Sequence, residues 1–256
     1  MIDMKRQEYR KFGPIETQTW GTLFRNLTEN RKSMAHPMFA EGLEFLGLNH
    51  TKIPSIEEVN RLLKAKTGWS GVPVEGLEEG DSFYPALSRR EYPIGNFIRD
   101  AKDINYTPAP DIFHDLYGHM PFFVNEAYAN FCADYAALAV KHLKEPRKKR
   151  MFERYFWFTM EFALTETPQG RRIFGAGIVS SKGESEFALS DKPTLIDFDI
   201  PTICLKEFRI DEFQGTLFLL KNPEQLYKSL KEVEKFVLDT YQSLEVDPSW
   251  MEKSKS

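Results

Sequence analysis

Two histidines, His114 and His119, stand five residues apart in a segment flanked by prolines, and this spacing restricts how the chain can fold around them. On a regular α-helix, at about 100° per residue, the two side chains would point about 140° apart. They converge only if the segment departs from a regular helix, or if His114 lies at the mouth of one. Convergent imidazoles would favour a metal site, whereas divergent ones would be ordinary capping or core histidines.

Glu161 is the best candidate for a third metal ligand. It stands in an aromatic and apolar stretch, Phe-Trp-Phe-Thr-Met-Glu-Phe, where an unpaired carboxylate is costly. A buried salt bridge is the competing interpretation. Two neutral imidazoles and one carboxylate form the facial triad that suits Fe(II) and leaves positions open for oxygen chemistry. The spacing differs from the His-Glu-x-x-His pattern of zinc proteases, but a zinc-dependent hydrolase using the same His pair stays an alternative.

Length and composition exclude several other classes of protein. The 256 residues suit one large domain, and a net charge of −4 disfavours a nucleic-acid binder. No run approaches the roughly 18 apolar residues of a membrane helix, and the N-terminal segment lacks the apolar region of a secretory signal. The two cysteines do not form a disulfide framework. We therefore expect a cytoplasmic protein that does not bind membranes.

Apolar periodicity predicts a mainly α protein with a small β component, in the α+β class. The segments predicted to be helical are 14–46, 55–66, 94–101, 125–142, 146–164 and 223–244. The predicted strands are 172–178, 186–188, 208–210 and 216–220. Residues 67–93 are rich in Gly and Pro, and we expect them to form an extended loop, which at this length is usually functional.

Four segments in order resemble one known family. Pro110–Pro121, with sequence PDIFHDLYGHMP, resembles the iron-binding motif of the pterin-dependent aromatic amino acid hydroxylases, and Trp157–Phe162 resembles their third-ligand segment. Residues 175–184 and 208–214 resemble two further family segments. The likeness covers roughly 67–220 and is closest to the single-domain bacterial phenylalanine 4-hydroxylases.

This resemblance implies a single catalytic domain over residues 1–256, without the N-terminal regulatory domain and the C-terminal tetramerisation tail of the animal enzymes. It therefore also favours a monomer.

The resemblance also implies a set of site residues. The matched iron ligands are His114, His119 and Glu161. The positions matched to the pterin site are Phe83, Gly76, Leu77, Asp115 and Glu184. The positions matched to the amino-acid site are Arg99, Asp111, Thr107, Trp157, Ser180 and Ile210.

The implied reaction is the hydroxylation of an aromatic amino acid by O2, with Fe(2+) and a tetrahydropterin as cofactors and no catalytic side chain beyond the iron centre. Trp157 and the apolar Ile210 favour phenylalanine as the substrate, and tryptophan or tyrosine is the alternative within the family.

A third hypothesis is a protein that binds a pterin or an amino acid without turnover. The partners expected are small molecules only.

Overall fold

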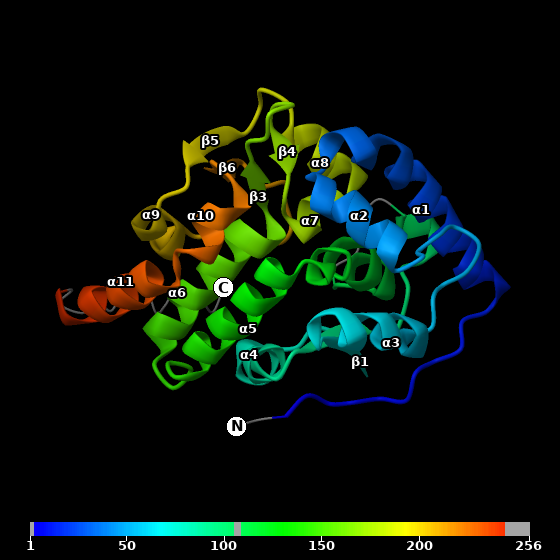
Figure 1. Cartoon of the computed structure of the whole chain (residues 1–256), viewed down its shortest axis with the longest axis horizontal. Coiled ribbons are helices and arrows are strands. Elements are labelled where there is room, and N and C mark those ends of the chain that lie inside the picture. The colour runs from blue at the N-terminus through cyan, green and yellow to red at the C-terminus, as the bar shows by residue number, and fades with distance from the viewer. Residues whose placement is uncertain (1–2, 105–108, 244–256) are drawn as a thin grey trace.

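The computed structural model describes residues 3–104 and 109–243. In this part of the chain helices predominate and the strands are short, as Figure 1 shows, which confirms the expected class. The α-helices are α1 Pro14–Met34, α2 Pro37–Phe45, α3 Ile56–Thr67, α4 Gly80–Ser88, α5 Glu126–Val140, α6 Pro146–Phe156, α7 Ala176–Val179, α8 Lys182–Ala188, α9 Ile200–Leu205, α10 Pro223–Tyr227 and α11 Leu230–Ser243. The shorter turns are the 3-10 turns η1 Ala101–Asp103 and η3 Phe122–Val124 and the π-helical turns η2 His114–His119 and η4 Trp157–Glu161.

The strands form two small sheets. The larger has the order β4-β3-β6-β5, in which β6 runs parallel to both β3 and β5, and β4 is antiparallel to β3. The smaller is a parallel pair, β1 with β2. The strand bounds are β1 Ser70–Val74, β2 Glu91–Gly95, β3 Ala163–Thr165, β4 Arg172–Ile173, β5 Thr194–Asp197 and β6 Thr216–Leu220.

Local sequence signals set several helix ends. The predicted helix at 55–66 is confirmed as α3, and the Ser55 hydroxyl accepts a hydrogen bond from the Glu58 N–H at 3.1 Å. The segment predicted as one helix over 14–46 is divided, because Pro37 cannot donate to a preceding carbonyl and begins α2 instead. The His36 ring accepts from the Met38 N–H and caps this second helix.

The prediction of an extended loop over 67–93 is wrong. This stretch forms β1, α4 and the start of β2, a strand–helix–strand unit in which the two strands are parallel. Pro73 and Pro93 lie inside these strands, which a two-stranded sheet tolerates because each strand has one edge outside the β1–β2 ladder. On that outer edge Pro73 only accepts, from the Gln7 N–H at 2.9 Å. The predicted helix at 94–101 is also wrong, because Ile94 and Gly95 complete β2.

The predicted strands at 186–188 and 208–210 are wrong as well, since the first ends α8 and the second lies in a loop. Only Arg172–Ile173 of the 172–178 prediction is a strand, while 216–220 is confirmed as β6. Short apolar runs do not by themselves separate strand from helix. The 125–142 helix is confirmed as α5, and the 146–164 prediction continues past α6 into a π-helical turn and β3.

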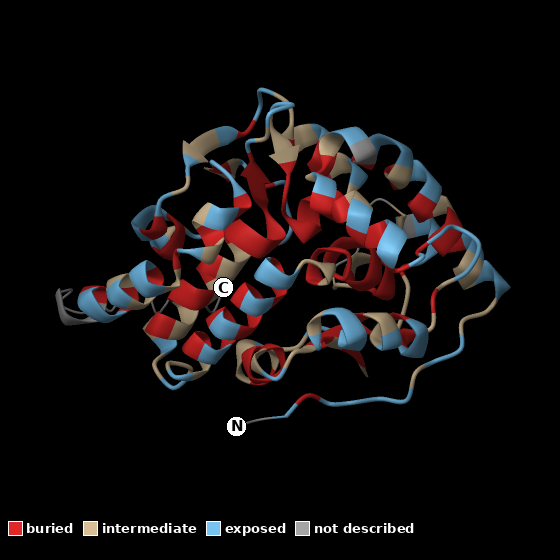
Figure 2. Ribbon diagram, in the orientation of Figure 1, coloured by how far each residue is buried: buried red, intermediate tan, exposed pale blue. Residues whose placement is uncertain are grey.

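The core is rich in aromatic side chains and surrounds the segment that carries the two histidines. Figure 2 shows the buried residues gathered in the centre of the fold, with exposed residues on the outer faces of α1, α2 and α3. The ring of Tyr117, inside η2, stacks on Phe113 at 4.7 Å and meets Phe24 and Phe39 edge-on at 5.3 Å. Such packing is expected to hold η2 rigidly. No helix in the described part of the chain combines the length and apolarity that a membrane span requires.

Candidate metal centre and active site

Both segments that carry the candidate metal ligands are π-helical turns. The Met120 N–H donates to the Asp115 carbonyl at 3.2 Å, and the Phe162 N–H donates to the Trp157 carbonyl at 2.9 Å. These bonds span five residues instead of four, so residues five apart lie on the same face of the turn. The expected departure from a regular helix is therefore confirmed, and it brings His114 and His119 together.

The three candidate ligands converge on one point. Nε2 of His119 lies 3.1 Å from Nε2 of His114 and 2.9 Å from Oε1 of Glu161. Nε2 of His114 lies 3.8 Å from Oε2 of Glu161. All three ligand atoms lie within 4.8 Å of one another, and no other group of three such side chains was found in the described residues.

Close backbone approaches hold the two turns against α7. A Cβ built on Gly175 would lie 2.1 Å from the Glu161 carbonyl oxygen, and one on Gly118 would lie 2.9 Å from the Ala176 carbonyl oxygen. Only glycine allows contacts this short. Gly175, before α7, and Gly118, inside η2, therefore let the backbone around α7 approach both ligand-bearing turns.

The pKa shifts of His114 and Glu161 fit metal binding. Burial lowers the pKa of His114 to about 4, so its ring is neutral at pH 7, as a ligand must be. Burial acts to raise the pKa of Glu161, but the adjacent His119 and His114 outweigh it and the net pKa lies below its usual value. Two neutral imidazoles and one carboxylate form the donor set that suits Fe(II).

Two cavities meet at this point, one of about 530 Å³ and one of about 370 Å³. His114, Glu161 and Trp157 line both of them. A metal held by the triad would therefore face both cavities, and two different small molecules could reach it from separate directions.

The smaller cavity contains four of the five positions matched to the pterin site: Phe83, Gly76, Leu77 and Asp115. The Phe83 ring contacts Phe156 edge-on at 5.2 Å, with the planes at 87°. Burial raises the pKa of Asp115 well above its usual value, while the Gly95 N–H donates to Oδ2 at 2.7 Å. Burial therefore favours the protonated form of Asp115, which can donate a hydrogen bond as well as accept one.

The larger cavity is lined by Arg99, Trp157, Ser180 and Ile210, four of the six positions matched to the amino-acid site. Glu184 also lies here and is absent from the lining of the smaller cavity, which differs from its expected place beside the pterin. Oε2 of Glu184 is buried without a hydrogen-bond partner, and burial raises the pKa of this carboxyl to about 7.

Asp111, another position matched to the amino-acid site, lines neither cavity. Asp111 is fully buried, and its oxygens accept from Nε and Nη2 of Arg99, both at 2.8 Å, and from the backbone N–H groups of Arg99 and His114. It therefore fixes the guanidinium of Arg99, which reaches the cavity. Thr107 lies outside the described residues.

Two buried side chains that sequence reasoning missed also bear on the site. Nε of Arg31, in α1, donates to the Val179 carbonyl at 2.9 Å, and Nη2 donates to the Ser181 carbonyl at 3.3 Å. Gln214 accepts a hydrogen bond from the Trp157 indole at 2.9 Å. No spacing signal marks either residue, because the partners are separated by more than 50 positions.

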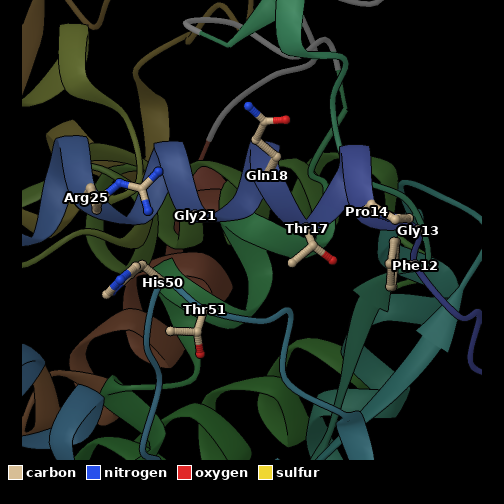
Figure 3. A pocket seen from close by; sticks show the side chains of 9 residues that line it. All are labelled: Phe12, Gly13, Pro14, Thr17, Gln18, Gly21, Arg25, His50 and Thr51. Atoms are coloured by element: carbon tan, nitrogen blue, oxygen red, sulfur yellow. The ribbon is translucent and has the colours of Figure 1, made fainter.

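A further cavity, of about 600 Å³, lies along α1 and the segment after α2 (Figure 3). It is lined by Arg25, His50, Thr17 and Gln18 among others, and shares no lining residue with the two cavities at the triad. It therefore lies apart from the candidate metal centre.

Comparison with known proteins agrees with the geometry. The family model described as biopterin-dependent aromatic amino acid hydroxylase matches residues 4–250. The phenylalanine-4-hydroxylase of Pseudomonas aeruginosa is 36% identical over 85% of this chain and 82% of that protein. That of Caulobacter vibrioides is 37% identical over 86% of this chain and 75% of that protein.

Solved structures agree as well. The Chromobacterium violaceum phenylalanine hydroxylase with bound oxidised iron superposes with a TM-score of 0.87 at 34% identity, over 92% of this chain and 86% of that one. The cold-active enzyme of Colwellia psychrerythraea gives a TM-score of 0.86 at 30% identity, over 93% of each chain. The chain belongs to the biopterin-dependent aromatic amino acid hydroxylase family.

Proposed function

We propose that this protein hydroxylates L-phenylalanine to L-tyrosine with O2, using Fe(2+) and a tetrahydropterin. The observation that carries this proposal is the junction of two cavities at the His114, His119 and Glu161 triad. One cavity would take a flat cofactor and the other an amino acid, and the candidate ligands His114 and Glu161 line both cavities. The similarity to phenylalanine-4-hydroxylases supports phenylalanine over the other aromatic amino acids.

The two cofactors divide the chemistry. When bound, iron and the pterin together activate O2, one atom of which enters the aromatic ring while the pterin provides two electrons. His114, His119 and Glu161 would hold the iron. The remaining task of the chain is to bind and orient the two organic molecules and to exclude bulk water.

The smaller cavity would hold the pterin. Phe83 offers a ring face or edge to a flat heterocycle, and Gly76 and Leu77 bring backbone groups to its rim. Asp115, whose protonated form is favoured by burial, would exchange a hydrogen bond with a ring nitrogen or carbonyl of the pterin.

The larger cavity would hold the amino acid. Arg99, oriented by Asp111, would bind the α-carboxylate. Glu184 would receive the α-ammonium group, because a buried carboxylate oxygen without a partner gains most from a cationic donor. The substrate ring would then lie beside Trp157 and Phe162, close to the metal. Ser180 lines the same cavity, and Thr107 stays part of the proposed head-group site.

Aerobic turnover of the purified protein tests the proposal. The protein is incubated with Fe(II), a tetrahydropterin and one of the three amino acids phenylalanine, tyrosine and tryptophan. The masses of the products are determined by mass spectrometry. We expect phenylalanine to gain one oxygen atom only when both cofactors are present. Oxygenation of tryptophan instead would overturn the substrate assignment. If folded, iron-loaded protein forms no oxygenated product, the proposal is wrong, and a zinc hydrolase or a non-enzymatic binding protein is favoured instead.

A cofactor-site variant tests the assignment of the two cavities. Phe83→Ala should raise the KM for the pterin while leaving the KM for phenylalanine and the iron content unchanged. Equal effects on both KM values would contradict separate cavities.

The proposal includes a single catalytic domain over residues 1–256 that acts as a monomer in the cytoplasm on small molecules and does not bind nucleic acid. The match of the family model to residues 4–250 supports one domain, and the net charge of −4 disfavours nucleic acid. Both cysteines are free and buried, which fits a reducing compartment. Light scattering coupled to size-exclusion chromatography tests the oligomeric state.

A further inference from the structure

Gln214 is a buried glutamine, 5% exposed, in the segment between α9 and β6. Its Oε1 accepts the indole N–H of Trp157 at 2.9 Å. Its Nε2 donates to the carbonyls of Arg209 at 2.8 Å and Glu212 at 3.1 Å. An indole is only a donor and a carbonyl only an acceptor, so these partners allow one orientation of the Gln214 amide.

The same residue also contacts a second side chain that lines the larger cavity. The backbone N–H of Gln214 donates to Oε1 of Glu184 at 3.3 Å. Trp157, Glu184 and Ile210 all line this cavity. Gln214 is thus hydrogen-bonded to the Trp157 indole, to the Glu184 carboxylate and to the backbone of the loop that carries Ile210. It does not itself line the cavity.

Stacking alone does not fix the indole. Trp157 stacks on Phe208 at 4.4 Å with the planes at 14°, and lies 4.5 Å from Phe162 with the planes at 34°. Arg150 covers the Phe208 ring at 4.7 Å from its centroid. Stacked rings can slide or rotate in their common plane at little energetic cost, whereas a hydrogen bond to the indole N–H specifies that rotation.

We propose that Gln214 is a specificity-determining positioning residue, which acts through Trp157 to set the width of the pocket for the substrate ring. This inference rests on the proposed function, since it concerns the amino-acid cavity of that reaction. In this proposal the fixed indole narrows the cavity to suit a six-membered ring, and a released indole would widen it toward a bicyclic one. Discrimination between substrates depends on such fixed walls.

The experiment is a double-mutant cycle of Gln214→Met and Trp157→Phe. Methionine has nearly the volume of glutamine without its hydrogen bonds, and phenylalanine retains an aromatic ring without the N–H. Gln214→Met should lower the kcat/KM ratio for phenylalanine over tryptophan about tenfold, mainly through a higher KM for phenylalanine. In the Trp157→Phe background the same change should alter that ratio less than about twofold.

A spectroscopic readout accompanies the kinetics. The near-ultraviolet circular dichroism of Trp157 is obtained as the difference between the parent and Trp157→Phe, and Gln214→Met should reduce it. Gln225→Met is the matched control, because Gln225 accepts a hydrogen bond from the Lys221 N–H outside both cavities and should leave kinetics and spectrum unchanged. If Gln214→Met does not fold, Gln214→Leu takes its place.

The outcomes separate this inference from the proposed function. A parent chain that is inactive on all three amino acids would refute the proposed function and the specificity role that depends on it. An active parent whose selectivity is unchanged in Gln214→Met would overturn the role of Gln214 alone. Equal effects of Gln214→Met in both backgrounds would show that it does not act through Trp157 and would also overturn the inference.

Discussion

Oγ of Ser180 lies 2.9 Å from Nδ1 of His114, although the two residues are 66 positions apart. The same hydroxyl is 2.8 Å from the Ala176 carbonyl, to which it donates its one proton. Oγ therefore accepts from His114, which places the ring proton on Nδ1 and leaves the lone pair of Nε2 directed at the triad.

Loss of this contact should weaken metal binding. Ser180→Ala is expected to reduce the affinity for Fe(II) or Co(II) by about 10- to 100-fold, because the orientation and tautomer of His114 are no longer fixed. Anaerobic titration calorimetry measures the affinity. Ser185→Ala is the matched control, since that buried hydroxyl shares its one proton between the carbonyls of Ile178 and Ser181 and does not contact His114. Equal affinities for the two variants would contradict the role given to Ser180.

Removing the carboxylate of the triad should abolish stabilisation by metal. In the parent protein, saturating Fe(II) or Co(II) is expected to raise Tm by about 5–10 °C, because only the folded state presents the three ligands together. Glu161→Gln should lose this rise. Glu184→Gln, which alters another buried carboxyl of the same cavity, should retain it. A normal rise in Glu161→Gln would remove Glu161 from the ligand set.

Glu184 should make the fold less stable as the pH rises. Burial raises its pKa from 4.5 to about 7, so between these values the folded state holds a proton that the unfolded state releases. The contribution of Glu184 to stability is therefore fully present below pH 4.5, decreases as the pH rises toward 7, and is lost above about pH 7. Relative to Glu184→Gln, the parent should lose about 1–2 kcal/mol between pH 4 and pH 8, since partial solvent screening reduces the effect.

Urea unfolding at a series of pH values measures this difference. Glu186→Gln, an exposed change on the same helix, should follow the parent at every pH. A Glu184→Gln curve parallel to that of the parent would show that the carboxyl stays ionised in the fold.

Arg99 and Asp111 should be strongly coupled in their effects on the free energy of unfolding. Arg99→Met is expected to destabilise the protein by about 3–5 kcal/mol, because it leaves the fully buried Asp111 without its partner. Adding Asp111→Asn to that variant should restore part of the loss. Arg89→Met, which breaks the exposed pairs with Asp3 and Glu91, should cost less than about 1 kcal/mol. Chemical denaturation measures the free energy of unfolding of the three variants. Similar losses of stability for Arg99→Met and Arg89→Met would show that the buried ion pair matters no more than the exposed ones.

The amino-acid sequence alone supported the choice of His114, His119 and Glu161. With a spacing of five residues, the two histidines could converge only on a distorted helix, and a carboxylate among aromatic residues required a partner. These observations left ordinary core histidines and a buried salt bridge as alternatives, and the resemblance to the family favoured a metal site. Helices with clear caps and periodicity, such as α3 and α5, were also predictable, because neighbouring residues determine them. Order and spacing of four segments carried the resemblance to the family.

Only the tertiary structure decided which side chains share a cavity. The residues 67–93 form a strand–helix–strand unit because the two strands pair with each other across the intervening helix, which no local pattern reveals. Asp111 lies behind Arg99, Glu184 lies on the wall of the larger cavity, and Gln214 meets Trp157 across 57 positions. Such contacts depend on packing between distant segments, whereas sequence patterns report the local preferences of the backbone.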